Sequence, residues 1–246
     1  MPTAGPVKVE VSGGIAVITL NRPPVNALSA EMFQALGRAA DRITEDDTVK
    51  AAILTAAGPT FCGGADVKEL ATHGPDERAA FFELTNATRS KVTSIPVPVI
   101  AALNGPAAGA GVSYATFCDY RIAVEDAFLT MPEISLGSVA AGGLPLMAIG
   151  VPAGALRYML FSGRRVPVRE AIAMHLVDEV VPADRLMEVA HERASVIAQK
   201  DRAALVAMKR AISEMSRNPI WDDDAYRQTQ RMTIDLIGRP GTPPEA

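Results

Sequence analysis

The first half of the chain alternates short apolar runs with amphipathic segments. Val7–Val11 and Ile15–Leu20 are rich in β-branched residues, and the Ser12–Gly14 segment between them predicts a β-hairpin. Ser29 then precedes apolar residues at the 3.6-residue period of a helix, which predicts a helix capped by Ser29. These apolar residues are Met32, Phe33, Leu36, Ala40 and Ile43.

Buried strands are predicted where apolar residues follow one another without polar alternation. Ala51–Ala56 and Val97–Leu103 are of this kind, which is typical of parallel strands covered on both faces. A helical pattern lies between them at Glu77–Lys91. The next predicted elements are a helix at Gly109–Phe117, strands at Tyr120–Ala123 and Phe128–Thr130, and a helix at Pro152–Phe161.

The pattern after Val168 is helical almost to the end of the chain. The predicted helices are Val168–Met174, Arg185–Gln199, Asp201–Met215 and Asp222–Leu236. Strands that alternate with helices, followed by a run of helices, indicate an α/β core with a helical C-terminal region. We place the change near Pro182, which gives a core over residues 1–182 and a helical region over residues 183–246.

Net charge and cysteine content indicate which binding partners and which cellular compartment to expect. The 246-residue chain has a formal net charge of −4. This charge argues against a nucleic-acid binder, whose surface would carry a basic stripe. Cys62 and Cys118 are the only cysteines, and a chain of this size whose first ten residues lack the apolar region of a signal peptide favours two reduced thiols. We therefore expect a cytoplasmic protein.

Two long uncharged stretches, Ser94–Cys118 and Ser135–Leu156, raise the question of membrane insertion. Prolines and glycines interrupt both of them. Such residues argue against a lipid-facing helix, so we predict buried strand–loop–helix units and no membrane partner.

Glycine-rich turns follow two of the predicted strands, at Gly63–Gly64 and at Asn104–Gly111. Each turn leads to a predicted helix start, where the first N–H groups have no partner within the helix. If the two strands are neighbours in a parallel sheet, these N–H groups lie side by side and can stabilise an oxyanion. Either turn alone is equally compatible with a plain strand-to-helix connection. The spacing does not match the dinucleotide-binding fingerprint.

Several segments resemble, in order and at comparable spacing, the signatures of the enoyl-CoA hydratase/isomerase (crotonase) superfamily. They are LNRPPVNALS (Leu20–Ser29), FCGGADVKEL (Phe61–Leu70), LNGPAAGAG with CDYRIA (Leu103–Ala123), MPEISLG with AAGG (Met131–Gly143), RRVPVREAIAMHLVDEVVP (Arg164–Pro182) and AALVAMKRAI (Ala203–Ile212). The resemblance covers roughly residues 7–215. It implies a crotonase-like ββα spiral core with a helical C-terminal domain, and assembly through the C-terminal helices into a homotrimer or a dimer of trimers.

The resemblance also implies roles for backbone groups. The N–H groups of Ala65 and Ala110 match an oxyanion hole that stabilises the enolate of an acyl-CoA thioester. Many members have Gly at the position of Ala110, but a backbone donor is preserved if the turn accepts a methyl group. Lys209 matches a residue that reaches the CoA phosphates, although a solvated helix lysine is an equal alternative. The backbone expected to line the CoA adenine pocket is that of Gly63, Gly64, Ala65, Asp66 and Val67.

The acid–base residues distinguish the activities of the family. Classical hydratases have a Glu at each of the positions matched by Ser113 and Glu133, and water addition uses both carboxylates. With Ser113 in place of the first, Glu133 alone resembles the arrangement of isomerases that move a 3-enoyl double bond to the 2-position. We therefore favour an isomerase, with a hydratase that uses Ser113 and water, or a non-catalytic acyl-CoA-binding protein, as alternatives.

Other side chains offer little chemistry. The histidines, His73, His175 and His191, are isolated and show no metal-ligand spacing, so we expect no metal site and no cofactor apart from the CoA of the substrate. His175 stands where many relatives have Gly and is expected to be structural. Asp66 is expected to cap the helix that begins near Val67.

Overall fold

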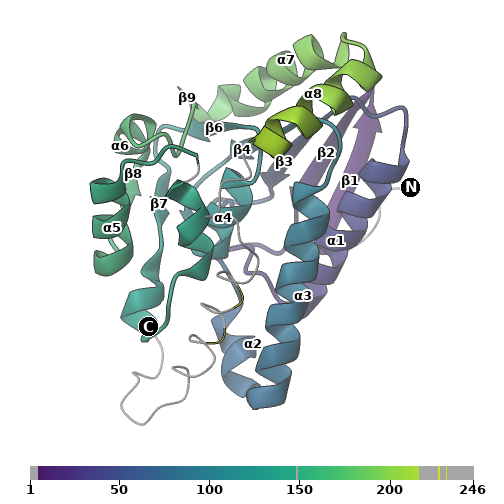
Figure 1. Ribbon diagram of the computed structural model, residues 1–246. Helices are drawn as coiled ribbons and strands as arrows, with labels where there is room; N and C mark the ends of the chain where they lie inside the picture. The colour runs from purple at the N-terminus through teal and green to yellow at the C-terminus, as the bar shows by residue number, and fades with distance from the viewer. Residues whose placement is uncertain (1–4, 148, 216–226, 228–230, 232–246) are drawn as a thin grey trace.

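A six-stranded sheet forms the centre of the molecule (Figure 1). The computed structural model describes residues 5–147, 149–215, 227 and 231. The first two strands form the predicted antiparallel hairpin, and every later strand of the sheet pairs in parallel. In spatial order the strands are β1 (Val7–Ser12), β2 (Ile15–Leu20), β3 (Ala51–Ala56), β4 (Val99–Leu103), β6 (Tyr120–Val124) and β9 (Glu179–Val181).

A second, three-stranded sheet lies at the carboxyl end of the first. It consists of β5 (Ala107–Ala108), β7 (Phe128–Thr130) and β8 (Val166–Pro167). Twice, the chain passes from a strand of the large sheet to a strand of the small sheet and then into helical structure. These ββα units are β4–β5–α4, where α4 is Ala110–Thr116, and β6–β7 followed by η1, a 3-10 helix at Pro132–Leu136.

Helices cover the large sheet above and below in the view of Figure 1. α7 (Leu186–Ala198) contacts β2, β3, β4 and β6, while α1 (Ala30–Glu45) packs on β1 and β2 and alongside α3 (Pro75–Thr93). The remaining helices are α2 (Val67–Thr72), α5 (Ala153–Ser162), α6 (Val168–Ala173) and α8 (Arg202–Met215), with further 3-10 helices η2 (Ala141–Met147) and η3 (Ala183–Arg185).

The start of α1 forms as the sequence predicts. The Ser29 side chain accepts a hydrogen bond from the Met32 N–H at 3.2 Å, which satisfies one of the unpaired donors of the first turn. The helix buries one face, including Phe33, Leu36 and Ile43, at 0–1% exposure. This face closes the core beside the hairpin and fixes the position of the loop that precedes Ser29.

α7 lies beyond the boundary that we expected near Pro182, yet it packs on the large sheet. Leu186, Val189, Ala190 and Ala194 of this helix are buried. Within the described residues, the packed core therefore continues at least to the end of α7. The predicted helix Asp222–Leu236 lies outside the described residues, apart from Arg227 and Arg231.

Two expectations about local structure were wrong. β4 begins at Val99, not Val97, because Pro96 and Pro98 have no N–H to donate to a neighbouring strand. The described part of Ser135–Leu156 contains no strand; it passes through η1 and η2 before α5 begins. The prolines and glycines of this stretch favour tight turns over extended structure.

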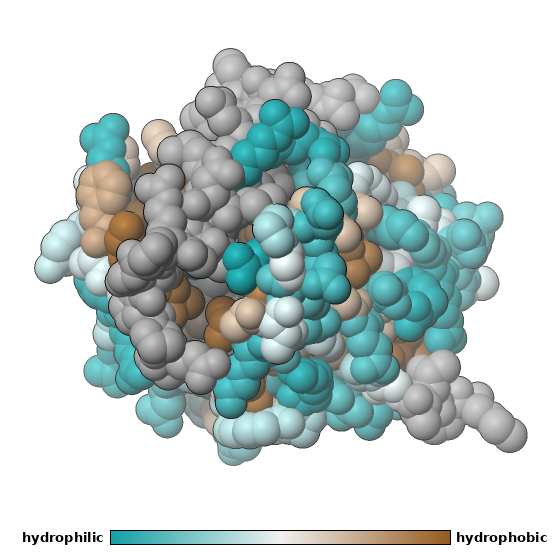
Figure 2. Space-filling view, turned by 90° about the horizontal axis from the view of Figure 1, so that it is seen from below, coloured by the Kyte–Doolittle hydropathy of each residue, from teal (hydrophilic) through white to brown (hydrophobic). Residues whose placement is uncertain are grey.

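The thiols of Cys62 and Cys118 are buried and free. Burial raises the pKa of each thiol to about 12, so both stay protonated at neutral pH. In the described part of the chain, no helix is long and apolar enough to span a membrane. On the face shown in Figure 2, apolar side chains form separate areas among hydrophilic ones.

Candidate active site

The turn after β3 is held by the loop that precedes α1. The Gly63 N–H donates to the Val25 carbonyl at 2.7 Å, and the Asp66 N–H donates to the Leu28 carbonyl at 3.0 Å. Among the described residues, the N–H of Ala65 between them has no acceptor. The loop thus uses the neighbouring donors and leaves the Ala65 N–H available.

The turn after β5 has a corresponding arrangement. The Gly109 N–H donates to the Thr130 carbonyl of β7 at 2.9 Å, and the Gly109 carbonyl accepts from the N–H groups of Val112 and Ser113 at 3.0 and 3.3 Å. The N–H of Ala110, the first residue of α4, donates to none of the described residues. A second backbone donor is therefore available where the chain enters α4.

The two turns pack directly against each other. Cys62 and Ala107 form a parallel bridge, in which the Ala108 N–H donates to the Cys62 carbonyl at 2.8 Å. A β-carbon on Gly64 would lie 2.9 Å from the Ala108 carbonyl oxygen and 3.5 Å from the Ala110 nitrogen. Gly64 also has a φ of +91°. Only glycine tolerates both this close contact and this positive φ. Glycine at position 64 therefore allows the two turns to approach each other.

Glu133 reaches the same place from the small sheet. β5 and β7 are paired in parallel, so the turn at Gly109 and the start of η1 leave the sheet side by side. A β-carbon on Gly109 would lie only 2.9 Å from the Glu133 Oε1. The other oxygen, Oε2, is buried and has no hydrogen-bond partner among the described residues. Desolvation raises the pKa of Glu133 to about 7, and a hydrogen bond from its own backbone N–H only partly opposes this effect.

Ser113 lies on α4, one turn after Ala110, and its side chain is engaged. It is buried, and its hydroxyl donates to the Gly142 carbonyl of η2 at 3.1 Å. A β-carbon on Gly142 would lie 2.2 Å from the Ser113 Oγ, so the two residues are closely packed. The hydroxyl therefore joins α4 to η2.

The residues expected to contact CoA lie in two different places. Gly63 and Val67 are exposed, beside the buried Asp66, which caps α2 as predicted by accepting from the Lys68 and Glu69 N–H groups. Lys209 is elsewhere. Its ammonium group binds the Asp119 carboxylate at 2.7 Å and the Val97 carbonyl at 2.9 Å, at the opposite end of β4 from the glycine turns. Within this chain, Lys209 is not brought to the candidate site.

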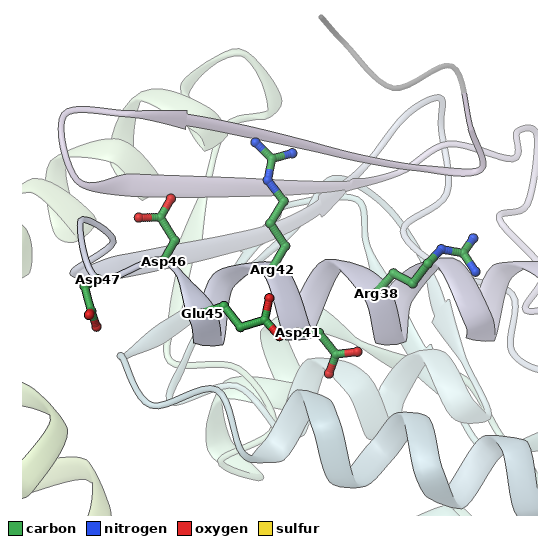
Figure 3. Close-up of a pocket in the computed structure, with 6 residues that line it drawn as sticks. All are labelled: Arg38, Asp41, Arg42, Glu45, Asp46 and Asp47. Carbon is green, nitrogen blue, oxygen red and sulfur yellow. The ribbon is translucent and has the colours of Figure 1, made fainter.

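A charged surface hollow of about 470 Å³ near the end of α1 is not part of this site (Figure 3). Several of its side chains bind groups that lie outside the hollow. Asp41 binds Lys91, Asp47 binds Arg202, and Arg42 donates to the Val9 carbonyl. The hollow is lined by Arg38, Asp41, Arg42, Glu45, Asp46 and Asp47.

Sequence reasoning did not identify the loop before α1 as part of the site. Asn26 is fully buried with a φ of +51°, and its side-chain amide donates to the carbonyls of Ala57 and Thr60. A polar residue between apolar segments after Pro23-Pro24 was the available signal, because Asn tolerates positive φ and bonds to nearby backbone. The role of Gly142 as an acceptor for Ser113 had no comparable signal.

Comparison with known proteins identifies the fold and then the family. An enoyl-CoA hydratase/isomerase structure from Xanthobacter autotrophicus superimposes with a TM-score of 0.87 at 31% identity, over 96% of this chain and 88% of that one, which confirms the crotonase-like α/β fold. The profile of the enoyl-CoA hydratase/isomerase family matches residues 10–234. The chain belongs to this family of acyl-CoA-processing enzymes.

Two curated relatives carry names that specify a reaction. A short-chain-enoyl-CoA hydratase from Clostridium acetobutylicum is 34% identical over 210 residues, which are 84% of this chain and 80% of the relative. A carnitinyl-CoA dehydratase from Proteus mirabilis is 35% identical over 209 residues, which are 83% of this chain and 80% of the relative. Both names describe the addition or removal of water, not a double-bond shift.

Proposed function

We propose that the protein is an enoyl-CoA isomerase that uses Glu133 as its single acid–base residue. The observation that supports this proposal is a buried carboxylate beside two unpaired backbone donors, with no carboxylate at position 113. The N–H groups of Ala65 and Ala110 bind the thioester oxygen and stabilise the charge that develops on it.

The reaction is a proton transfer between two carbons. The Glu133 carboxylate removes a proton from the α-carbon of a 3-enoyl-CoA, and the electron pair moves to the thioester oxygen to give a dienolate. The same proton then returns from the Glu133 carboxyl group to the γ-carbon, which leaves the double bond at the 2-position. A group with a pKa of about 7 exchanges a proton readily in both directions near neutral pH. This sequence consumes no water and requires neither a metal nor a redox cofactor.

Hydration is the second candidate, because the relatives described above are named for it. In that reaction the Ser113 hydroxyl would orient water while Glu133 supplies the proton to the α-carbon. The hydrogen bond from Ser113 to the Gly142 carbonyl disfavours this role, because the hydroxyl proton is already used. The Glu133 carboxylate has one buried oxygen without a hydrogen-bond partner among the described residues, and such burial costs stability, which disfavours a non-catalytic acyl-CoA-binding protein.

CoA binding and assembly complete the proposal. We place the CoA adenine beside the backbone from Gly63 to Val67, where both ends of this segment are exposed. We also propose a homotrimer or a dimer of trimers in the cytoplasm. The exposed Met208 and Ile212 on α8 provide apolar surface for such contacts, and the free thiols suit a reducing compartment. Light scattering that showed a stable monomer of 25.9 kDa at micromolar concentration would contradict the assembly.

The test of the proposed activity combines a substrate panel with one substitution. Purified protein is incubated with 3-enoyl-CoA, 2-enoyl-CoA and 3-hydroxyacyl-CoA esters, and we expect the double-bond shift to be fastest. Glu133→Gln preserves shape but removes the proton acceptor, so turnover should fall at least about a hundredfold with ester binding nearly unchanged. A Glu133→Gln protein that is fully active on every ester would rule out the single-base mechanism.

A further inference from the structure

We propose that Arg22 is a positioning residue for the oxyanion hole. By pairing with Asp66, it holds the turn from Gly63 to Asp66 so that the Ala65 N–H keeps its direction toward the thioester oxygen. This inference rests on the function proposed above, and it assigns a role to a side chain outside the site itself.

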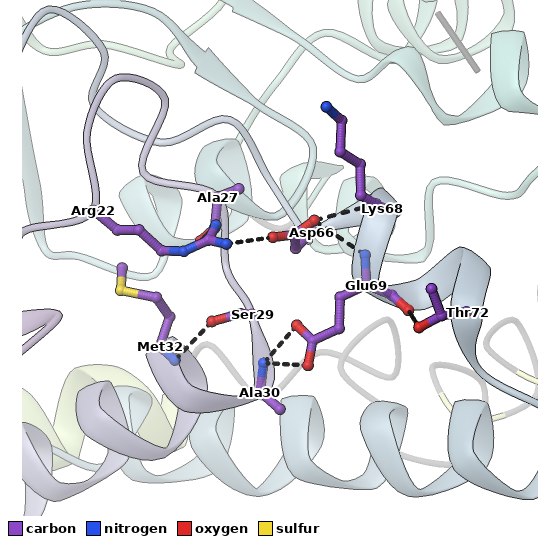
Figure 4. A network of polar contacts seen from close by, with 9 residues as sticks. All are labelled: Arg22, Ala27, Ser29, Ala30, Met32, Asp66, Lys68, Glu69 and Thr72. Atoms are coloured by element: carbon purple, nitrogen blue, oxygen red, sulfur yellow. Dashed lines mark hydrogen bonds and ion pairs between the residues drawn. The ribbon is translucent and has the colours of Figure 1, made fainter.

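Arg22 connects the loop before α1 to the residue directly after Ala65 (Figure 4). Its Nη2 lies 2.8 Å from the Asp66 Oδ2, and its Nη1 donates to the Ala27 carbonyl at 3.2 Å. The Arg22 backbone N–H donates to the Asn26 Oδ1 at 2.8 Å, which anchors the start of the same loop. The guanidinium group therefore ties the loop and the turn together.

The Asp66 carboxylate is fully used by this arrangement. While Oδ2 binds Arg22, Oδ1 accepts from the N–H groups of Lys68 and Glu69 at 3.1 and 3.2 Å. The Asp66 side chain is 12% exposed. Its orientation is thus set from two sides, by the start of α2 and by Arg22.

α2 is also tied to the start of α1. The Glu69 carboxylate accepts from the Ala30 N–H at 3.1 Å, next to the Ser29 cap (Figure 4). The Gly63–Asp66 turn also meets the loop through three backbone hydrogen bonds. They run from the Gly63 N–H to the Val25 carbonyl, from the Leu28 N–H to the Gly64 carbonyl, and from the Asp66 N–H to the Leu28 carbonyl. The Arg22–Asp66 ion pair adds a charged side-chain contact to these backbone bonds, at the residue directly after Ala65.

The effect of Arg22 should be local. The Arg22 side chain is 44% exposed, and ion pairs with an exposed partner contribute little to global stability. Catalysis is more sensitive, because an oxyanion donor should lie about 2.7–3.1 Å from the oxyanion and a misplacement of about 1 Å can cost a hundredfold in rate. Loss of the pair should therefore lower the rate without unfolding the protein.

The experiment compares Arg22→Gln with a matched control, Arg193→Gln. Arg193 of α7 binds Glu179 of β9 at 2.8 Å, with exposures of 46% and 22% for the two side chains, so the pair joins neither of the glycine turns. Arg22→Lys is the conservative variant, since a lysine can keep one contact with Asp66. For each protein we would measure kcat and KM on the preferred ester, the melting temperature, and the ionisation of bound acetoacetyl-CoA followed by enolate absorbance.

We expect Arg22→Gln to lower kcat about tenfold to a hundredfold with little change in KM. Bound acetoacetyl-CoA should need a pH about one unit higher to form its enolate, which corresponds to a tenfold weaker preference for the anion. Arg22→Lys should give intermediate values, and Arg193→Gln should match the unsubstituted protein. If Arg22→Gln does not fold, the intermediate values of Arg22→Lys provide the test.

The inference fails if Arg22→Gln matches Arg193→Gln in both kcat and enolate formation. It also fails if kcat falls while the ionisation of the bound probe does not move, because the oxyanion hole would then be undisturbed. Acetoacetyl-CoA loses its acidic proton without the help of Glu133. A fully active Glu133→Gln protein would thus end the single-base mechanism and leave the Arg22 result intact, while a normal Arg22→Gln would end only the positioning role.

Discussion

The Oε1 of Glu133 lies against the backbone of Gly109, in the space that a side chain at position 109 would occupy: a β-carbon there would be 2.9 Å from the oxygen. Gly109 has a φ of +51° and directly precedes Ala110. The proposed proton carrier and one of the proposed oxyanion donors therefore share the same short piece of backbone. Any change at Gly109 acts on both.

Gly109→Ala should separate the carboxylate from the turn. The methyl group must displace Glu133, and the positive φ adds a strain of about 1–3 kcal/mol. We expect turnover to fall at least about tenfold, as for other small displacements of catalytic groups. Gly13→Ala is the matched control, because Gly13 has a φ of +58° but no atom within 4 Å of its β-carbon position. Equal turnover in the two variants would show that the contact with Glu133 is unimportant.

The pH dependence of the reaction should follow Glu133. Its pKa is raised to about 7, chiefly by desolvation, and the base must be ionised to accept the α-proton. We expect kcat/KM to be level above this pH and to fall tenfold per unit below it, since kcat/KM reports the free enzyme. Initial rates between pH 5 and pH 9 measure the profile. An acidic limb with a midpoint near 4.5, the ordinary value for Glu, would show that the carboxylate is solvated.

Stability should respond to pH in the opposite direction. Because the pKa is higher in the folded protein than in the unfolded chain, the stability that protonated Glu133 contributes is fully present below about pH 4.5 and is lost as pH rises through about 7. Relative to Glu133→Gln, the unsubstituted protein should lose about 2–3 kcal/mol of unfolding free energy between pH 5 and pH 8. Urea denaturation of both proteins at the two pH values measures this difference. A constant difference would mean that the folded and unfolded pKa values are the same.

The backbone donor at Ala65 can be removed without removing a structural hydrogen bond. Ala65→Pro lacks the N–H, and among the described residues this N–H has no acceptor. We expect turnover to fall by about a hundredfold to a thousandfold, the usual cost of one oxyanion donor. Ala65→Gly keeps the N–H and should stay close to normal. Circular dichroism verifies folding, and a folded, fully active Ala65→Pro would contradict the assignment of this donor.

Ser113 distinguishes the two candidate reactions. If the protein is an isomerase, Ser113→Ala should keep most of its turnover and lose only about 1 kcal/mol of stability from the hydrogen bond to Gly142. Thr116→Ala is the control, because Thr116 is a buried residue of the same helix whose hydroxyl bonds to the Val112 carbonyl. A loss of a hundredfold in Ser113→Ala but not in Thr116→Ala would give Ser113 a part in proton transfer and favour hydration.

Much of the large sheet could be predicted from the sequence because its signals are local. A few neighbouring residues are enough to predict each of these elements: the β-branched hairpin strands, the apolar run Ala51–Ala56 and the cap at Ser29. The small sheet could not be predicted in full, because β5 and β8 are only two residues long. Strands this short form through pairing with segments distant in sequence, and no periodicity marks them.

The candidate site, too, could be predicted only in part from the sequence. Both glycine turns follow from strands that end in Gly-rich sequence, and Glu133 was identified through family resemblance. The contact between Gly109 and Glu133 depends on the parallel pairing of β5 with β7, which the sequence does not display. Likewise, His175 has a φ of +59°, a conformation that glycine adopts more readily than other residues, and this is visible only in the structure. The sequence thus predicted which residues belong to the site. The distances between them depend on the pairing of short strands, which is visible only in the structure.

The two buried thiols give the protein internal probes of local opening. Cys62 immediately precedes the first glycine turn, and its thiol donates to the Asn26 carbonyl in the loop before α1; Cys118 follows the C-terminal end of α4. Because both thiols are protonated and shielded, an alkylating reagent can react only when the surrounding structure separates. The two reaction rates therefore report separately how often the loop leaves the Cys62 turn and how often the end of α4 opens. The ratio of the two rates compares local opening on the two sides of the site, with native cysteines as the only probes.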